Sequence, residues 1–235
     1  MDSLLRYKDK YFSILGDSIS TLEGVSEPCD AVFYAGAKKF ETNVFEISDT
    51  WWGQVVEHLG GKILVNNSYS GSMVIKHRLC EIESYGCSDL RTGSLSRDDI
   101  NPDVVMVYMG VNDFGCAAKP FPSSDEGENE SVFYVAYNRM LEKIKVNYPD
   151  AEIWCLTLPV SKCERNPGFF FPYRMSGYHI DEYNKGIKIA VQNHGCKLID
   201  LYLEDKPHDT LEGFHPTGEG MKTLSQNSIE IIRKW

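Results

Sequence analysis

The chain has 235 residues, of which 42% are hydrophobic and 25% are charged, so it carries enough apolar side chains to form a sizeable core. Its 34 acidic residues outnumber the 24 Lys and Arg residues, and the formal net charge is −10. That charge argues against nucleic acid as a partner, because phosphates attract basic surfaces. It also disfavours binding to an anionic membrane surface.

The sequence predicts neither a membrane segment nor a leader. It lacks a run of about twenty apolar residues, the length that crosses a bilayer. The N-terminus lacks the basic and apolar regions of a signal peptide. We therefore expect a cytoplasmic protein with no membrane partner, the alternative being a secreted protein whose export signal has been removed. The oligomeric state has no signature in the sequence.

Five short apolar runs, rich in β-branched residues, predict the strands of a sheet. The runs are nearly continuous rather than alternating, which is typical of strands buried on both faces. In chain order they cover 11–17, 62–68, 103–110, 151–158 and 196–202.

Amphipathic stretches between these runs predict the helices, at 50–59, 132–147, 178–194 and 217–235. Alternating strands and helices indicate an α/β fold with a doubly wound parallel sheet, in which binding sites lie at the carboxyl ends of the strands. We interpret residues 1–235 as one domain. Three connections are long enough to suggest function, at 19–49, 111–131 and 159–177.

The first strand ends in Gly16, Asp17 and Ser18. A serine just past a buried strand, after a glycine that permits a tight turn, is where a nucleophile becomes exposed at the top of a sheet. The N–H groups of a following helix would favour a developing oxyanion there. The alternative is that Asp17, Ser18 or Ser20 only caps that helix.

Two further positions could supply oxyanion donors. Asn112 follows the third strand, and its uncharged amide donates a hydrogen bond without titrating. Gly71 follows the second strand, where a glycine lets the backbone N–H approach a ligand. Each is also explained by an ordinary turn.

His215 lies in the loop before the last helix, and Glu212 precedes it by three residues. A histidine base needs a carboxylate that fixes its tautomer and steadies the imidazolium, and Glu212 could reach the far ring nitrogen. The other histidines have no such setting. Because a doubly wound sheet brings its carboxyl strand ends to one rim, we expect Ser18, Gly71, Asn112 and His215 to lie together.

These residues resemble the four blocks of the SGNH hydrolases, also called the GDSL esterase/lipase family. The matching motifs are GDS at 16–18, a glycine at 71, GVND at 110–113 and HP at 215–216, in the family's order. The resemblance implies a flavodoxin-like three-layer α/β/α fold with five parallel strands. It also implies that Ser18 is the nucleophile and His215 the base, with the Ser18 and Gly71 amides and the Asn112 side chain as the oxyanion hole.

The chain departs from the family at one place. The family has Asp three residues before the histidine, whereas this chain has Glu212. A glutamate is longer by one methylene and can still accept the imidazole N–H, so we assign the triad acid to Glu212. The alternatives are Asp209 or a Ser–His dyad assisted by backbone carbonyls.

The expected activity is hydrolysis of short-chain, mainly acetyl, esters through an acyl-enzyme, without a metal or another cofactor. Aromatic residues of the long loops suit stacking on sugar rings, so the expected substrate is a small-molecule or carbohydrate ester. Candidate substrate-binding residues are Asp17, Trp51, Phe170 and Tyr173.

Three alternatives remain open at this stage. The first is a lipase or thioesterase of the same family. The second is a flavin carrier that uses the hydroxyl-rich turn at 18–24 to hold a phosphate. The third is a carbohydrate-binding relative without catalytic activity.

Overall fold

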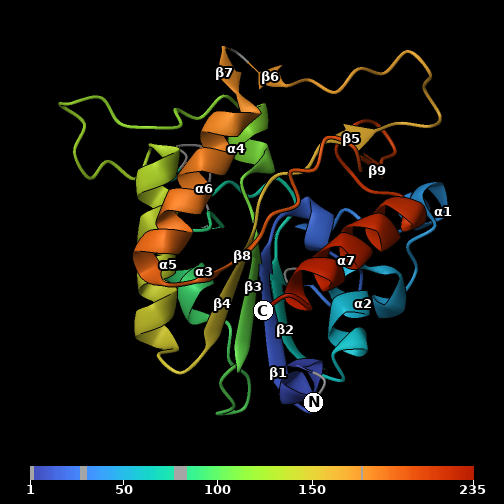
Figure 1. Ribbon diagram of the computed structural model, residues 1–235, viewed down its shortest axis with the longest axis horizontal. Helices are drawn as coiled ribbons and strands as arrows, with labels where there is room; N and C mark the ends of the chain where they lie inside the picture. The colour runs from blue at the N-terminus through green and yellow to red at the C-terminus, as the bar shows by residue number, and fades with distance from the viewer. Residues whose placement is uncertain (1–2, 27–30, 77–83, 176) are drawn as a thin grey trace.

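A computed structural model describes residues 3–26, 31–76, 84–175 and 177–235; the gaps at 27–30 and 176 fall in the first and third long connections. Its centre is a parallel sheet of five strands in the order β2-β1-β3-β4-β8 (Figure 1). The strands are β1 (Tyr11–Gly16), β2 (Lys62–Ser68), β3 (Val104–Tyr108), β4 (Glu152–Leu156) and β8 (Lys197–Ile199). The α/β fold with a five-stranded parallel sheet is confirmed.

Two layers of helices cover the sheet. On one face α2 (Trp51–His58) packs against α7 (Gly218–Ile232), and on the other α5 (Phe133–Asn147) packs against both α3 (Asp89–Gly93) and α6 (Ile180–His194) (Figure 1). All five residues of β3 are buried, because neighbouring strands cover its edges and helices cover its faces. This explains why its sequence is apolar without alternation.

Hydroxyl caps fix where two of the helices begin. Thr50 accepts a hydrogen bond from the Gly53 N–H at the start of α2, and Thr217 accepts one from the Gly220 N–H at the start of α7. Such caps satisfy backbone donors that have no partner inside the helix. The helix predicted at 217–235 therefore begins directly after the loop that carries His215.

Short elements fill the remaining chain, most of them near the carboxyl ends of the strands. Besides η1 (Ser3–Tyr7), the single-turn pieces are η2 (Ser18–Ser20), α1 (Ala37–Thr42), η4 (Ile47–Asp49) and α4 (Val111–Gly115). Two small sheets pair β5 (Ser161–Lys162) with β9 (His208–Asp209) in parallel and β6 (Arg174–Met175) with β7 (Tyr178–His179) antiparallel.

The last strand is shorter than the sequence predicts. The apolar run 196–202 forms only the three residues of β8. Beyond it, the Thr157 hydroxyl accepts the backbone N–H groups of Leu201 and Tyr202, at 2.8 and 3.1 Å, and itself donates to Asp200. A side chain thus takes the place of strand pairing, and the chain leaves the sheet.

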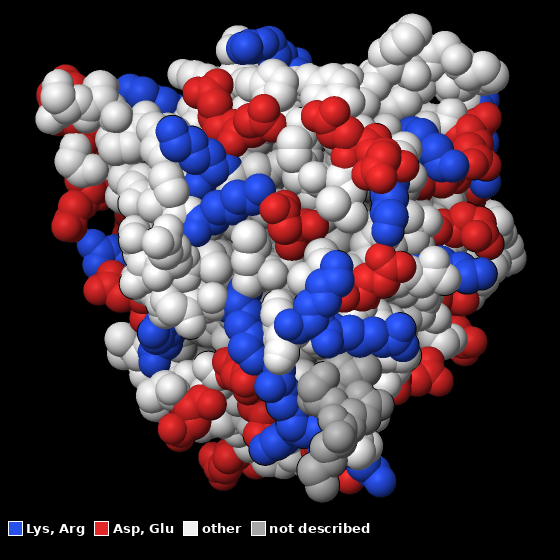
Figure 2. Space-filling view, viewed as in Figure 1, with Lys and Arg blue, Asp and Glu red and all other residues white. Residues whose placement is uncertain are grey.

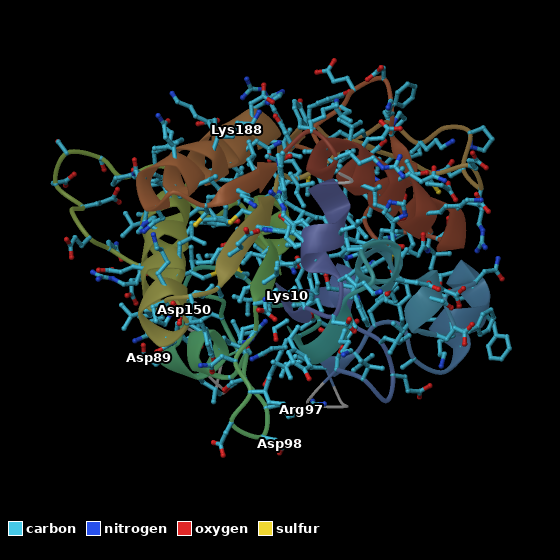
Figure 3. All side chains as sticks on the ribbon, turned by 60° about the horizontal axis from the view of Figure 1, so that its bottom comes forward. Lys10, Asp89, Arg97, Asp98, Asp150 and Lys188 are labelled. Atoms are coloured by element: carbon cyan, nitrogen blue, oxygen red, sulfur yellow. The ribbon has the colours of Figure 1, made fainter. Side chains whose placement is uncertain are left out.

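Charged side chains of both signs are spread over the face seen in Figure 2. At the amino ends of the strands, opposite the predicted site, Lys10 forms an ion pair with Asp103 at 2.7 Å. Figure 3 turns this end toward the viewer and shows Arg97 and Asp98 on a projecting turn. None of the helices in the described ranges is long and apolar enough to cross a membrane.

Candidate active site

Ser18 is the first residue of η2, and only Asp17 separates it from the end of β1. The turn is held from inside the chain. Asp17 accepts the Ile19 N–H at 3.0 Å, and the Thr21 hydroxyl donates to the Ser18 carbonyl at 2.8 Å. Asp17 therefore caps this turn, and the Ser18 hydroxyl takes no part in the capping.

The Ser18 hydroxyl meets His215 across 197 positions of sequence. Ser18 Oγ lies 2.9 Å from His215 Nε2, and His215 Nδ1 contacts Glu212 Oε1. A carboxylate only accepts hydrogen bonds, so Nδ1 carries the ring proton and Nε2 is free to accept the serine proton. The three groups are connected in the order acid, imidazole and hydroxyl, an arrangement that can activate a serine.

Asp209, the alternative acid, is engaged elsewhere. Its carboxylate accepts the Glu164 N–H at 2.9 Å and the Thr217 hydroxyl at 2.7 Å. These bonds tie the base of the His215 loop to the connection after β5. Glu212, rather than Asp209, is the carboxylate in contact with His215.

The loop that carries Glu212 and His215 is anchored at Gly213. The Gly213 N–H donates to the Thr210 hydroxyl at 2.9 Å, and its carbonyl accepts the Ser161 hydroxyl at 2.6 Å. Gly213 has φ +110°, a conformation that glycine tolerates best. A side chain there would also collide with the Phe169 ring, since an added Cβ would lie 2.6 Å from it.

A strap formed by residues 31–35 joins three of the loops around Ser18. The Ala31 carbonyl accepts the Ser70 N–H, the Phe33 N–H donates to the Thr21 hydroxyl, and the Tyr34 hydroxyl donates to the Pro216 carbonyl. The Phe33 ring lies on the imidazole of His215. Nothing in the sequence distinguishes Phe33 from the other aromatic residues of the long loops.

Two of the three predicted oxyanion donors, Asn112 and Gly71, come from loops that contact each other. Asn112 is in the first turn of α4, and its side-chain amide donates to the Ser72 carbonyl at 2.9 Å. Gly71, the neighbour of Ser72, has φ +77° and nothing within 4 Å of the position of an added Cβ. The loop after β2 and the Asn112 amide thus form one unit beside the end of β1, where Tyr69 donates its N–H to the Gly16 carbonyl.

Two buried charged residues that sequence analysis missed support this unit. The Asp113 carboxylate accepts the N–H groups of Val74 and Ile75, and burial raises its pKa to about 6. The fully buried Arg91 donates to the Ser72 hydroxyl and to the Gly16 carbonyl, each at 2.8 Å. Asp113 was detectable because it adjoins Asn112. Arg91 lies in the short helix α3, and no neighbouring motif in the sequence marks it as a functional residue.

The four predicted substrate-binding residues have different surroundings. Trp51 is fully buried and its indole N–H donates to Ser20, and Asp17 is buried in the η2 turn. Neither has a surface on which a substrate could lie, which corrects the expectation that they bind one. Phe170 is 88% exposed, and Tyr173 is partly exposed beside Phe171.

The hydroxyl-rich turn at 18–24 is committed to internal contacts, which removes the phosphate-binding role considered for it. Ser20 accepts from Trp51, Thr21 donates to the Ser18 carbonyl, and Ser18 pairs with His215. Among the described residues, no three His, Cys, Asp or Glu side chains are grouped so that they could hold a metal ion.

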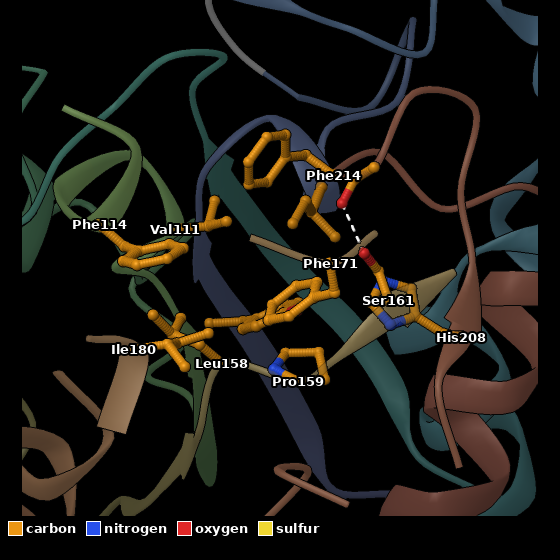
Figure 4. Close-up of a pocket in the computed structure, with 12 residues that line it drawn as sticks. Val111, Phe114, Leu158, Pro159, Ser161, Phe171, Ile180, His208 and Phe214 are labelled. Carbon is orange, nitrogen blue, oxygen red and sulfur yellow. Dashed lines mark hydrogen bonds between the residues drawn. The ribbon is translucent and has the colours of Figure 1, made fainter. Parts of the chain in front are cut away.

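An apolar cavity adjoins the site (Figure 4). Ser161 and His208 lie on one side of it, and Val111, Phe114 and Ile180 lie on the other. Within this cavity, a volume of about 20 Å³ is available to the centres of water-sized groups. The cavity therefore has room for one or two such groups.

Comparison with known proteins places the chain in one family. Residues 10–162 match the family model described as GDSL-like Lipase/Acylhydrolase. A search of curated proteins finds no significant match.

Solved structures share the fold over nearly the whole chain. One is a GDSL-like lipase from Bacteroides ovatus, with 23% identity, 97% of this chain and 100% of that chain covered, and a TM-score of 0.72. A GDSL-like lipase from Bacteroides uniformis has 25% identity, 94% coverage of each chain and a TM-score of 0.69. A carbohydrate acetylesterase from Sinorhizobium meliloti has 12% identity, 97% and 100% coverage and a TM-score of 0.64.

Proposed function

The chain belongs to the GDSL-like lipase/acylhydrolase family of ester-bond hydrolases, and from that premise we propose that it is a serine esterase that removes short acyl groups, mainly acetyl, from carbohydrate hydroxyls. The observation that carries the proposal is the contact of Ser18 Oγ with His215 Nε2 at 2.9 Å, with Glu212 at the other ring nitrogen.

The first half of the reaction transfers the acyl group to Ser18. His215 Nε2 takes the Ser18 proton as Oγ attacks the acyl carbon. The Ser18 and Gly71 N–H groups and the Asn112 amide stabilise the tetrahedral oxyanion. The imidazolium then gives its proton to the leaving oxygen, the carbon–oxygen bond breaks, and the alcohol departs.

The second half releases the acid. Water attacks the acyl-enzyme and gives a proton to His215, which returns it to Ser18 Oγ as the carboxylic acid leaves. Glu212 holds the Nδ1 proton throughout and compensates the positive charge on the ring.

The size of the cavity supports a short acyl group. Its space of about 20 Å³ for the centres of water-sized groups suits one or two carbon atoms, which favours a short acyl group over a fatty one. The carbohydrate part of the proposal has two supports. The structurally similar Sinorhizobium meliloti protein is a carbohydrate acetylesterase, and Phe170 and Tyr173 offer exposed aromatic faces on the long loop after β5.

A chain-length series of 4-nitrophenyl esters tests the acyl group, with acetate expected to have the highest kcat/KM and butyrate and longer acids falling steeply. Acetate release from acetylated xylo-oligosaccharides tests the alcohol. A preference for long acyl chains would overturn the assignment.

Ser18→Ala tests the nucleophile. It should lower kcat by at least about a thousand-fold and abolish covalent labelling by a fluorophosphonate probe. In the wild-type protein, mass spectrometry should find the probe attached to Ser18. The matched control is Ser124→Ala, which removes an exposed serine and should leave labelling intact. Full ester turnover by Ser18→Ala would sink the mechanism.

A further inference from the structure

The apolar cavity is lined by chain neighbours of three of the residues assigned to the reaction. Its wall contains Ile19, Val111 and Phe214, which adjoin Ser18, Asn112 and His215, whereas those three residues are not themselves in the wall. A group that extends from an ester at Ser18 past these neighbours would enter the cavity. The cavity has room for one or two non-hydrogen atoms.

His208 is the unusual member of this wall. Its side chain is buried, with 3% of its surface exposed, and its Nδ1 lies 3.0 Å from the Val160 carbonyl oxygen. A carbonyl oxygen only accepts hydrogen bonds, so Nδ1 carries the proton and Nε2 is a bare acceptor. Burial lowers the pKa of His208 to about 4, which keeps the ring neutral at ordinary pH.

His208 Nε2 has no hydrogen-bond partner among the described residues. Buried polar atoms are almost always hydrogen-bonded, and an exception calls for an explanation. Ser161, on the same side of the cavity, already donates its hydroxyl proton to the Gly213 carbonyl at 2.6 Å. Both polar side chains on this side thus present acceptors in otherwise apolar surroundings (Figure 4).

We propose that the cavity is a subsite for a small apolar group ending in a hydroxyl, whose hydrogen bond His208 Nε2 accepts. The proposal rests on the esterase function proposed above and specifies its substrate further. The hydroxyl belongs either to a short hydroxyacyl group or to the alcohol part of the ester. Hydrogen-bonding sites of this kind reject analogues that lack the hydroxyl, because the buried acceptor then stays unpaired.

Two pairs of isosteric esters distinguish these sources. The acyl arm compares 4-nitrophenyl glycolate with 4-nitrophenyl propionate, which differ by a hydroxyl in place of a methyl group. The alcohol arm compares 2-hydroxyethyl acetate with propyl acetate, which differ in the same way. Each kcat/KM ratio is divided by the ratio for hydroxide-catalysed hydrolysis, which removes the intrinsic reactivity. We expect the hydroxylated ester to be favoured by about five- to tenfold in one arm.

His208→Asn tests the residue. The Asn amide can still donate to the Val160 carbonyl, whereas the acceptor at the Nε2 position is lost. The corrected ratio should fall to about one in this variant. The matched control is His58→Asn, at the exposed end of α2, which should keep the wild-type ratio. A ratio near one in both arms of the wild type, or a preference that survives in His208→Asn, overturns the subsite.

A binding measurement separates failure of the subsite from failure of the esterase function. The inactive Ser18→Ala protein, labelled with ¹⁵N in histidine, is titrated with ethyl glycolate and 2-hydroxyethyl acetate, and with their isosteres ethyl propionate and propyl acetate. One of the two hydroxylated esters should shift the His208 Nε2 resonance, assigned by its loss in His208→Asn, and the isosteres should not. The absence of a shift with both hydroxylated esters would refute the subsite even if the wild type hydrolysed none of the four.

Discussion

The phenyl ring of Phe33 lies flat on the imidazole of His215, with the ring centroids 3.5 Å apart and the planes inclined by 5°. Phe33 is held from its backbone, whose N–H donates to the Thr21 hydroxyl at 2.9 Å, and Thr21 in turn donates to the Ser18 carbonyl. The stack therefore links the orientation of the imidazole to the turn that carries Ser18. An aromatic face also favours the cationic ring that forms during turnover.

Replacing Phe33 by leucine should lower kcat by about two- to fivefold, the size of a cation–π contact at a partly exposed site. Leucine keeps apolar bulk but has no aromatic face. Phe33→Tyr retains the face and should keep nearly wild-type kcat. Steady-state kinetics on 4-nitrophenyl acetate checks both variants, and an unchanged kcat in Phe33→Leu would show that the stack has no part in turnover.

A pair of amide variants distinguishes the role of Glu212 from that of Asp209. Glu212→Gln should lower kcat by roughly a hundred- to ten-thousand-fold, because the Nδ1 proton loses its carboxylate. It should change the melting temperature little, since the Glu212 side chain is 45% exposed.

Asp209→Asn should show the opposite pattern. It loses an acceptor for the Glu164 N–H or the Thr217 hydroxyl and should be less stable, by about 1–2 kcal/mol, with a smaller loss of kcat. Thermal unfolding and kinetics on the same samples give the comparison. If Asp209→Asn were the variant that lost catalysis at unchanged stability, the triad acid would have to be reassigned.

Arg91 should be essential for stability. Arg91→Met removes a buried guanidinium that donates to the Gly16 and Asn67 carbonyls, and should lower the free energy of unfolding by about 3 kcal/mol or more. Urea denaturation measures the loss. Arg97→Met, which removes an exposed arginine, is the control and should be within about 0.5 kcal/mol of wild type. An equally small effect at Arg91 would contradict the role inferred for it.

Asp17 should make the protein less stable as pH rises toward neutrality. Burial raises its pKa from 3.8 to about 7, and the nearby Asp113 charge adds to this. Between about pH 4 and 7 the native chain keeps this proton while the unfolded chain loses it. The free energy of unfolding therefore falls through this window, by an amount on the order of a few kcal/mol.

Asp17→Asn should remove this part of the slope, because an amide has no proton to lose and its oxygen can still accept the Ile19 N–H. Any remaining slope from Asp113 should end near pH 6, where its carboxyl titrates. Urea denaturation at intervals from pH 4 to 8 measures both curves. Parallel curves for the two proteins would exclude Asp17 as the source.

The sequence by itself determined the fold and the positions of the reacting groups along the chain. Residues 62–68 were predicted as a strand and form β2 with the same bounds. The predicted run 103–110 contains β3, whose burial on both faces requires a continuous apolar run, which is a local property. Helices at 132–147 and 178–194 were likewise visible from their period and agree with α5 and α6 to within two residues. The turn at Gly16 and Ser18 could also be predicted, because it depends only on residues adjacent in the sequence.

Only the tertiary structure decided what surrounds those groups. Trp51 was a candidate substrate-binding residue but is buried against Ser20, and Phe33 looked no different from other aromatic residues but stacks on His215. The choice between Glu212 and Asp209 depended on which carboxylate the folded loop turns toward the imidazole. The hydrophobic period of a segment indicates whether a side chain faces the core. The partners of that side chain can lie about 50 to 200 positions away in the sequence. They depend on how the loops pack together, and no local pattern encodes this packing.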